Sequence, residues 1–328
     1  MNIYDIAKEA GVSIATVSRV LNNKGTVSAA TRARVEAILK ENNYTPSAIA
    51  RGMVSKSMRT VAVLTVDIRV PHYARTAYTI EREFSRRGYE VILCNTGGDR
   101  AETLRYLQVV NQKQVDGVVL VGSVFDTICQ GTEMEKLLSG VPVVLANGKL
   151  DLPNAYSVTV DDKYGVSLAV EHLVARGRKN IYYIKDRDTD SARAKRDGFL
   201  EAMRRNGLEF ADHVLEAGET LASSMETVQV LLTQGIVPDG IVCGEDLTAA
   251  GALKALLRAG LRVPGHVAVV GFNNSDYAHL CEPVLTSVDN KPEQVALLCV
   301  QLLESSIERS EAYSSVVLQP ELAQGETS

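Results

Sequence analysis

Apolar residues follow a helical spacing along the first sixty residues of the chain. Ile3, Ile6, Ala7 and Ala10 would share one face of a first helix, and a short turn containing Gly11 follows. A second apolar stripe starts near residue 14, and a third lies beyond residue 28. Asn2 and Ser28 stand where their side chains can cap the first and third helices. The pattern predicts three short helices.

From Thr60 onward the pattern changes to short apolar runs that alternate with helical segments of ten or more residues. The continuous run 61–66 is typical of a buried parallel strand. Strands that alternate with helices indicate an α/β fold with parallel sheets. The predicted strands are 61–66, 90–94, 117–121, 142–146, 157–160, 181–184, 240–243, 267–271 and 315–318.

Nine strands are more than one sheet needs, so we expect two doubly wound lobes. The stretch 148–154, which contains one Gly, one Pro and one Asn, resembles a first crossover between them. A second crossover is expected near 283–289 and a third before the last strand.

Composition narrows the class of protein. The 328 residues are 45% hydrophobic and 23% charged, and no apolar run approaches the roughly 18 residues of a membrane span. The first residues lack a basic segment followed by an apolar one, so secretion is not expected. Five widely separated cysteines argue against a disulfide framework or a zinc ribbon, and a reducing cytoplasm fits best.

Charge is unevenly distributed. Residues 1–59 hold nine basic and four acidic residues, a net charge of +5, whereas the whole chain has a net charge of -5. A basic segment on an acidic body suggests that the basic part meets a polyanion, although a solvated helical bundle would have the same charge.

The second predicted helix has the features of a DNA-reading helix. Two short helices joined by a turn with Gly form a helix-turn-helix, whose second helix enters the major groove. With Val17 and Val20 facing inward, a helical wheel turns Ala15, Ser18, Arg19 and Asn22 outward. Arginine and amide side chains read base edges, and hydroxyls bind phosphates. Helical spacing alone fits a three-helix bundle with a polar outer face equally well.

The residues themselves resemble a known family. The segments Ile3–Ser13 and Ala15–Asn22, followed by Val27-Ser28 and Asn43–Pro46, closely resemble the DNA-binding head of the lactose-repressor/galactose-repressor (LacI/GalR) family. Later words such as Val270–Phe272 extend the resemblance through the chain. It implies a small all-α helix-turn-helix domain and an α/β periplasmic-binding-protein-like domain of two doubly wound parallel-sheet lobes. It also implies a homodimer or tetramer; no long C-terminal heptad helix is present, so we expect a homodimer.

The resemblance also sets the expected domains. They are a helix-turn-helix domain at 1–46, a hinge helix and linker at 47–59, and an effector-binding and dimerisation domain at 60–328. Lobe 1 is expected at about 60–148 and 288–312, and lobe 2 at about 156–284 and 313–328. In the family the hinge segment folds on DNA and inserts an apolar side chain into the minor groove; here that position is Met53. The residues expected to contact DNA are Asn2, Ile14, Ala15, Thr16, Ser18, Arg19, Asn22, Thr26, Ser28, Tyr44, Ser47 and Met53.

The effector cleft is expected at the carboxyl ends of the strands, between the lobes. Family positions point to His72 and Tyr73 after the first strand and to Lys195, where the family commonly has arginine. Asn273 stands where the family often has aspartate. The residues expected to bind the effector are His72, Tyr73, Asn147, Asp161, Arg193, Lys195, Asp246 and Asn273, with Asp246 alternatively a helix cap. These departures leave a sugar-like effector and an anionic one both open.

The sequence therefore predicts a cytoplasmic transcriptional regulator, most simply a repressor, that binds pseudo-palindromic double-stranded operator DNA under control of a small polar, sugar-like effector. Neither a cofactor nor a metal site is predicted, because the five histidines show no metal spacing. One alternative replaces the small effector by a protein co-regulator. A remote alternative is an enzyme fused to a DNA-binding head, although the common catalytic motifs are missing.

Overall fold

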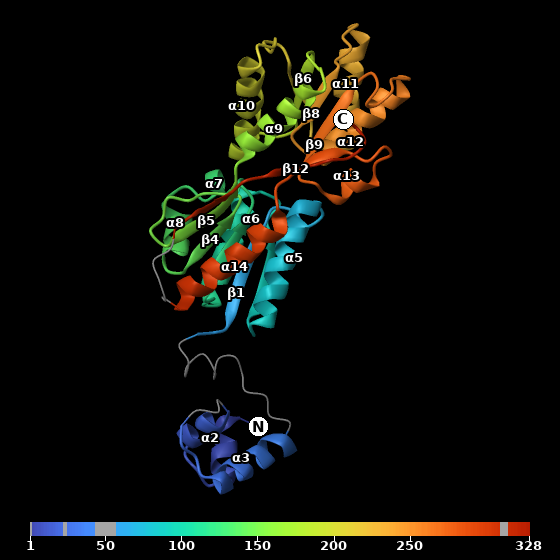
Figure 1. Ribbon diagram of the computed structural model, residues 1–328. Coiled ribbons are helices and arrows are strands. Elements are labelled where there is room, and N and C mark those ends of the chain that lie inside the picture. Colours follow the sequence, from blue (N-terminus) through green and yellow to red (C-terminus); the bar gives the residue numbers. More distant parts are fainter. Residues whose placement is uncertain (1, 22–24, 43–56, 309–313) are drawn as a thin grey trace. The chain divides into compact units, whose positions relative to one another are not determined.

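The structure is a computed structural model that describes residues 2–21, 25–42, 57–308 and 314–328. The chain divides into two compact units, Met1–Arg59 and Thr60–Ser328. Figure 1 shows the helices of the first unit in dark blue and the α/β elements of the second unit in colours from light blue through green and yellow to red.

The first unit contains three helices within its described residues: α1 (Ile3–Glu9), α2 (Ile14–Leu21) and α3 (Ala29–Glu41). The predicted caps are confirmed, since the side chain of Asn2 accepts hydrogen bonds from the amides of Tyr4 and Asp5, and that of Ser28 accepts one from the amide of Thr31. Gly11 adopts φ +62°, a left-handed conformation that favours glycine, and so allows the sharp turn between α1 and α2. The three helices enclose a small core of Ile6, Ala7, Ala10, Val17, Val20, Val35 and Ile38.

In its described residues the second unit contains two six-stranded sheets, which confirms the predicted α/β class. The strand orders are β11-β5-β4-β3-β1-β2 and β12-β10-β9-β8-β6-β7. Every strand pair is parallel except β10 with β12. The strands of the first sheet are β1 (Thr60–Thr65), β2 (Glu90–Asn95), β3 (Gly117–Val121), β4 (Val143–Ala146), β5 (Ala155–Val160) and β11 (Val316–Leu318). Those of the second sheet are β6 (Ile181–Lys185), β7 (Val214–Glu216), β8 (Gly240–Cys243), β9 (Ala268–Phe272), β10 (Thr286–Asp289) and β12 (Glu321–Ala323).

Helices cover both faces of each sheet. On the first sheet, α5 (Pro71–Arg86) and α14 (Pro292–Glu308) lie side by side on one face, while α6 (Arg100–Gln112), α7 (Phe125–Ile128) and α8 (Thr132–Ser139) cover the other (Figure 1). On the second sheet, α9 (Asp162–Ala175) and α10 (Asp190–Arg205) pack on one face. The other face carries α11 (Leu221–Thr233), α12 (Asp246–Arg258) and α13 (Asp276–Leu280). Strands buried on both faces explain the continuous apolar runs in the sequence.

The lobe boundaries differ from those expected. The stretch 148–154 is not a crossover, because it joins β4 to β5 within the first sheet. The chain leaves the first sheet after β5 and after β11, and leaves the second sheet after β10. β5 and β11 therefore belong to the first lobe rather than the second. In each case the crossover follows the carboxyl end of a strand, so the connections run where the two sheets face one another.

Three short strands of the second sheet, β7, β10 and β12, were not among the nine predicted. Each is short and has no more than two consecutive apolar residues, too few for a recognisable run. Among the helices of the described ranges, none is both long and apolar enough to cross a membrane.

Candidate functional site

The second helix of the first unit presents a polar face. Val17 and Val20 of α2 are buried, whereas Ala15 and Arg19 are exposed and the Ile14 side chain is 40% exposed. The hydroxyl of Ser13 accepts a hydrogen bond from the amide of Thr16 at 3.2 Å and fixes the start of this helix. The geometry gives α2 an outward face that can enter a DNA groove.

Other residues predicted to contact DNA are placed by local bonds. Asn2 and Ser28 are exposed helix caps, and the Thr16 hydroxyl lies 3.0 Å from that of Ser13. Thr26 is exposed and Ser18 is half-buried. The backbone amide of Asn2 donates to the carboxylate of Asp5 at 2.8 Å, so a phosphate contact of Asn2 would use its side-chain NH₂ group. Asn22, Tyr44, Ser47 and Met53 lie outside the described residues, as does the expected hinge segment.

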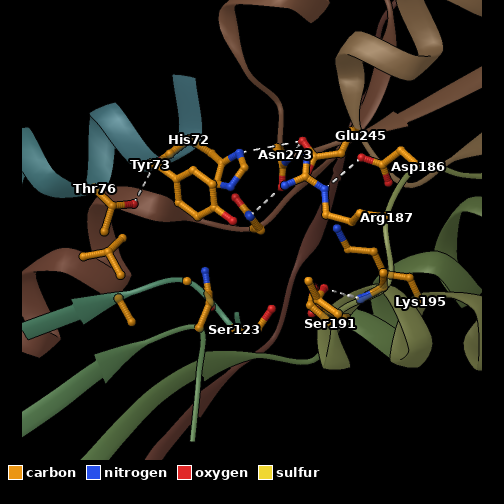
Figure 2. Close-up of a pocket in the computed structure, with 18 residues that line it drawn as sticks. His72, Tyr73, Thr76, Ser123, Asp186, Arg187, Ser191, Lys195, Glu245 and Asn273 are labelled. Carbon is orange, nitrogen blue, oxygen red and sulfur yellow. Dashed lines mark hydrogen bonds and ion pairs between the residues drawn. The ribbon is translucent and has the colours of Figure 1, made fainter. Parts of the chain in front are cut away.

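A polar cavity lies between the two sheets of the second unit (Figure 2). The space inside it that is open to the centre of a water molecule is about 50 Å³. Its lining comes from segments that follow the carboxyl ends of strands in both sheets, as expected for a doubly wound fold. The lining residues are His72, Tyr73, Thr76, Val121, Gly122, Ser123, Ala146, Asn147, Asp162, Asp186, Arg187, Thr189, Ser191, Ala192, Lys195, Glu245, Asn273 and Asn290.

Arg187, in the loop after β6, is held among carboxylates. Its Nε lies 3.0 Å from Asp186, and one Nη lies 3.6 Å from Glu219 and 3.9 Å from Glu245. Burial disfavours the charged form of Arg187, but Glu245 and Asp186 more than offset this effect and raise its pKa. The guanidinium is therefore permanently charged and largely neutralised by its surroundings.

Lys195 of α10 is buried, and its amine has defined partners. Its Nζ donates a hydrogen bond to the carbonyl of Gly244 at 2.9 Å and lies 3.9 Å from the ring centroid of Phe272. Nearby, the Ser191 hydroxyl donates to Asp162 at 2.6 Å. Burial raises the pKa of Asp162, while the charge of Lys195 opposes that rise. This corner of the cavity joins a hydroxyl, a carboxyl group and an ammonium group.

Amide side chains supply further hydrogen-bonding groups. Asn273 donates to Glu245 at 2.6 Å and accepts from Asn290 at 2.7 Å. The side-chain oxygens of Asn290 and Asn147 are buried and accept no hydrogen bond from the residues that the structure describes. A buried acceptor without a donor is costly, so both oxygens indicate a ligand that donates hydrogen bonds. Asn147 and Asn273 have positive φ values of 56° and 101°, a conformation that asparagine tolerates better than most residues.

His72 and Tyr73 enter the cavity from the first turn of α5, with their ring centroids 3.9 Å apart. Burial, reinforced by the charges of Arg187 and Lys195, lowers the pKa of His72 to about 3. Burial also raises the pKa of Tyr73 to about 12. Both rings are therefore neutral at pH 7, and the 3.7 Å approach of His72 to Glu245 joins an uncharged imidazole to a carboxylate.

Five of the eight predicted effector residues line this cavity: His72, Tyr73, Asn147, Lys195 and Asn273. The other three do not. Asp161 caps α9 by accepting from the amide of Tyr164, and Arg193 pairs with Asp188 and Asp190 at the surface. Asp246 is buried behind the cavity, where it accepts hydrogen bonds from the Ser275 amide and the Ser287 hydroxyl, each at 2.6 Å.

The sequence analysis did not predict four charged residues that line the cavity: Asp162, Asp186, Arg187 and Glu245. Asp162 and Glu245 each stand one position from a residue that was chosen, and helix geometry decides which of the two faces the cavity. Ser191 could have been found, because it precedes Lys195 by one helical turn. Asp186 and Arg187 lie in a loop without periodicity, and only their position after a strand marks them. Within the described ranges, no three His, Cys, Asp or Glu side chains gather as a metal site.

Two family models match the chain. Residues 2–47 match the bacterial regulatory proteins of the lacI family, and residues 170–328 match a periplasmic binding protein-like domain. A helix-turn-helix transcriptional regulator from Lachnoclostridium phytofermentans is 34% identical over 306 residues, which cover 92% of each chain. The ribose operon repressor of Halalkalibacterium halodurans is 34% identical over 94% of this chain and 90% of its own length.

Solved structures agree with these relatives. The lac repressor dimer bound to operator and the anti-inducer ONPF matches with a TM-score of 0.88 and 25% identity, over 100% of this chain and 98% of that one. The regulator CelR in complex with cellobiose matches with a TM-score of 0.74 and 28% identity, over 100% of both chains. The chain therefore belongs to the lacI family of bacterial regulatory proteins.

Proposed function

We propose that this protein is a sequence-specific transcriptional repressor whose affinity for operator DNA is set by a small, polar, hydroxylated ligand bound between its two lobes. One observation carries this proposal: a single chain combines an exposed recognition helix with a polar cavity lined from two sheets. The first provides contact with DNA, and the second provides a ligand with partners on both lobes. We infer no catalytic turnover and place the protein in the cytoplasm, where the chromosome is accessible.

On the DNA side, Arg19 is proposed to read a base edge or a phosphate from the exposed face of α2. Ile14 and Ala15, at the exposed start of the helix, are suited to contact a thymine methyl group. A homodimer would place two such helices on a pseudo-palindromic operator, with half-sites one helical turn or a multiple apart. The net charge of +5 on residues 1–59 supports contact with phosphates.

On the ligand side, the lining favours a molecule rich in hydroxyl groups. Hydroxyls can donate to the unpartnered oxygens of Asn147 and Asn290 and accept from Lys195 or Arg187. His72, Tyr73 and Asn147 come from the first lobe, whereas Lys195, Glu245 and Asn273 come from the second. A ligand that contacts residues of both lobes stabilises the arrangement in which the lobes lie close together. It thereby shifts the population of conformations presented to DNA.

The proposal is tested in two steps. Bound genomic fragments are first selected with the full-length protein, and the affinity for the recovered operator is then measured by fluorescence anisotropy with and without a panel of sugars and polyols. We expect specific binding at nanomolar concentration that weakens steeply with salt, with about 0.9 added to the log–log slope for each neutralised phosphate. At least one sugar or polyol should change operator affinity, and none should be consumed. Failure to select any sequence would contradict the DNA function, and indifference to every small ligand would contradict the effector function.

A further inference from the structure

Lys195 is a buried cation without an anionic partner. The residue is only 6% exposed, and its side chain reaches into the cavity beside Ser191 (Figure 2). Its Nζ donates a hydrogen bond to the Gly244 carbonyl and lies over the ring of Phe272. Among the residues that the structure describes, no carboxylate forms an ion pair with this amine. Burial of an unpaired ammonium group costs free energy, so its place in the cavity indicates a function.

A second buried lysine has the ordinary arrangement. Lys185, at the end of β6, is 8% exposed, and its Nζ lies 3.2 Å from a carboxylate oxygen of Glu216 and 3.5 Å from one of Asp188. Lys185 does not line the cavity. The two lysines are therefore equally buried but differ in their surroundings, and Lys185 provides a matched reference for Lys195.

The hydrogen bonds at Lys195 fit another form of its nitrogen. An ammonium group has three N–H donors, but within the described part of the chain only the Gly244 carbonyl accepts from this one. A protonated imine keeps the positive charge and has a single N–H. The Gly244 carbonyl satisfies that one donor, and the face of the Phe272 ring stabilises the charge.

A carboxyl group near the amine can transfer the protons that imine formation requires. Asp162 accepts a hydrogen bond from the Ser191 hydroxyl at 2.6 Å. Burial raises the pKa of Asp162, and the charge of Lys195 opposes this rise, which shows that the two groups interact. A carboxyl group with a raised pKa is better suited to accept a proton and return it near neutral pH.

We propose that Lys195 binds the effector covalently, as a reversible imine with a short hydroxylated aldehyde or ketone. The small space of about 50 Å³ in the cavity favours a short ligand, whose hydroxyls can donate to the unpartnered oxygens of Asn147 and Asn290. Arginine, which the family commonly has at this position, cannot form an imine. This inference rests on the proposed small-ligand function and adds its binding chemistry.

The reaction conserves atoms and charge. Asp162 accepts a proton from the ammonium group, and the freed Nζ attacks the carbonyl carbon. A proton moves from nitrogen to oxygen and leaves a neutral carbinolamine. Asp162 then returns its proton to that oxygen, the C–O bond breaks, and the nitrogen lone pair forms the C=N bond. One ammonium group and one carbonyl group thus give one protonated imine and one water molecule.

Reductive trapping tests the covalent bond directly. The full-length protein is incubated with glycolaldehyde, D-glyceraldehyde or dihydroxyacetone and with sodium cyanoborohydride, which adds hydride to the imine carbon and leaves a stable secondary amine. Intact mass and peptide mapping then locate the adducts. We expect an adduct at Lys195 that forms at least about tenfold faster than at Lys185 or at the exposed Lys254. Lys195→Arg keeps the positive charge and should lose this adduct, whereas Lys185→Met should retain it.

Matched alcohols separate the covalent bond from ordinary binding. Ethylene glycol and glycerol have nearly the size and the hydroxyls of these probes but lack the carbonyl group. In calorimetry a carbonyl probe should bind at least about tenfold more tightly than its alcohol, and Lys195→Arg should remove this difference. The same probe should change operator affinity, and the change should survive dialysis only after treatment with cyanoborohydride.

Three results would overturn the covalent assignment: no adduct at Lys195, equal labelling of Lys195 and Lys254, or a preference for the carbonyl probe that persists in Lys195→Arg. If Lys195→Arg does not fold, as judged by circular dichroism, the adduct map of the unsubstituted protein decides alone. Operator affinity that responds to sugars or polyols without any adduct would leave control by a small ligand intact, so the two proposals can fail separately.

Discussion

His72 Nδ1 lies 3.7 Å from Glu245 Oε2, although His72 follows the first strand of one sheet and Glu245 follows a strand of the other. This approach joins the two lobes across the ligand cavity. Glu245 also accepts a hydrogen bond from Asn273, so the contact is anchored in the second lobe.

The neutral state of His72 leads to a first prediction. Because the pKa of His72 is lowered to about 3, the imidazole does not titrate between pH 5 and 8, and His72→Gln should leave the pH dependence of ligand affinity unchanged to within about twofold over that range. Calorimetry at pH 5.5 and 7.5 measures this. His266→Gln, remote from the cavity, serves as the control. A tenfold change of affinity near pH 6.5 that disappears in His72→Gln would show that the ring titrates after all.

The second prediction concerns α10. Lys195 faces the cavity and Arg193, two residues earlier, faces solvent, since residues two apart lie on different sides of a helix. Lys195→Met should weaken ligand binding by tenfold or more and leave ligand-free operator affinity near the wild-type value. Arg193→Met removes the same charge from the same helix and should leave ligand affinity within about twofold. Dose–response curves for operator release compare the two, and equal effects would place the ligand elsewhere.

The third prediction concerns the recognition helix. Arg19→Ala should cost roughly 1–3 kcal/mol of operator binding if Arg19 contacts a base. The melting temperature should stay the same, because the side chain is exposed. Arg34→Ala, equally exposed but on α3, is the matched control for loss of one positive charge. Gel-shift titrations in which both variants lose the same affinity would reduce Arg19 to a general electrostatic role.

The fourth prediction concerns stability and pH. Burial raises the pKa of Asp126 to about 7, although its carboxylate accepts a hydrogen bond from the Lys149 amide at 2.7 Å. Between about pH 4 and 7 the folded state therefore keeps a proton that the unfolded state has released, so stability falls as pH rises through that window. Asp126→Asn retains the acceptor and should reduce this fall, as measured by urea unfolding at pH 5 and 7.5. Burial also raises the pKa of Asp246 to about 7, so Asp246 should preserve part of the fall in stability in the Asp126→Asn variant. The exposed Asp151→Asn is the control, and an unchanged pH dependence in Asp126→Asn would contradict the assignment.

Much of the fold could be predicted from the sequence, because strands that are buried on both faces appear as continuous apolar runs. The run 61–66 became β1, whose six residues are all buried. Crossovers were harder to place, since a Gly- and Pro-containing stretch such as 148–154 resembles an interlobe connection but joins neighbouring strands. Only strand pairing distinguishes the two cases, and pairing is a long-range property.

The cavity was predicted at the level of strand ends but not of single side chains. Asp161 and Asp162 are adjacent, and the helix cap takes the first while the second faces Ser191. Glu245 and Asp246 are also adjacent. Glu245 lines the cavity, whereas Asp246 turns inward and accepts a hydrogen bond from the Ser275 amide. Such choices depend on tertiary contacts, which the local sequence does not encode.

The central claim is that one chain couples the ligand cavity to DNA binding, and thermodynamic reciprocity tests it most directly. If the ligand changes operator affinity by some factor, the operator must change ligand affinity by the same factor, typically about 5–150-fold. The measurement is calorimetric titration of the full-length protein with its ligand, in the absence and in the presence of saturating operator DNA. The account predicts dissociation constants that differ at least about fivefold and agree with the shift in operator affinity. Identical ligand affinities with and without operator, in a protein that binds both, would contradict it.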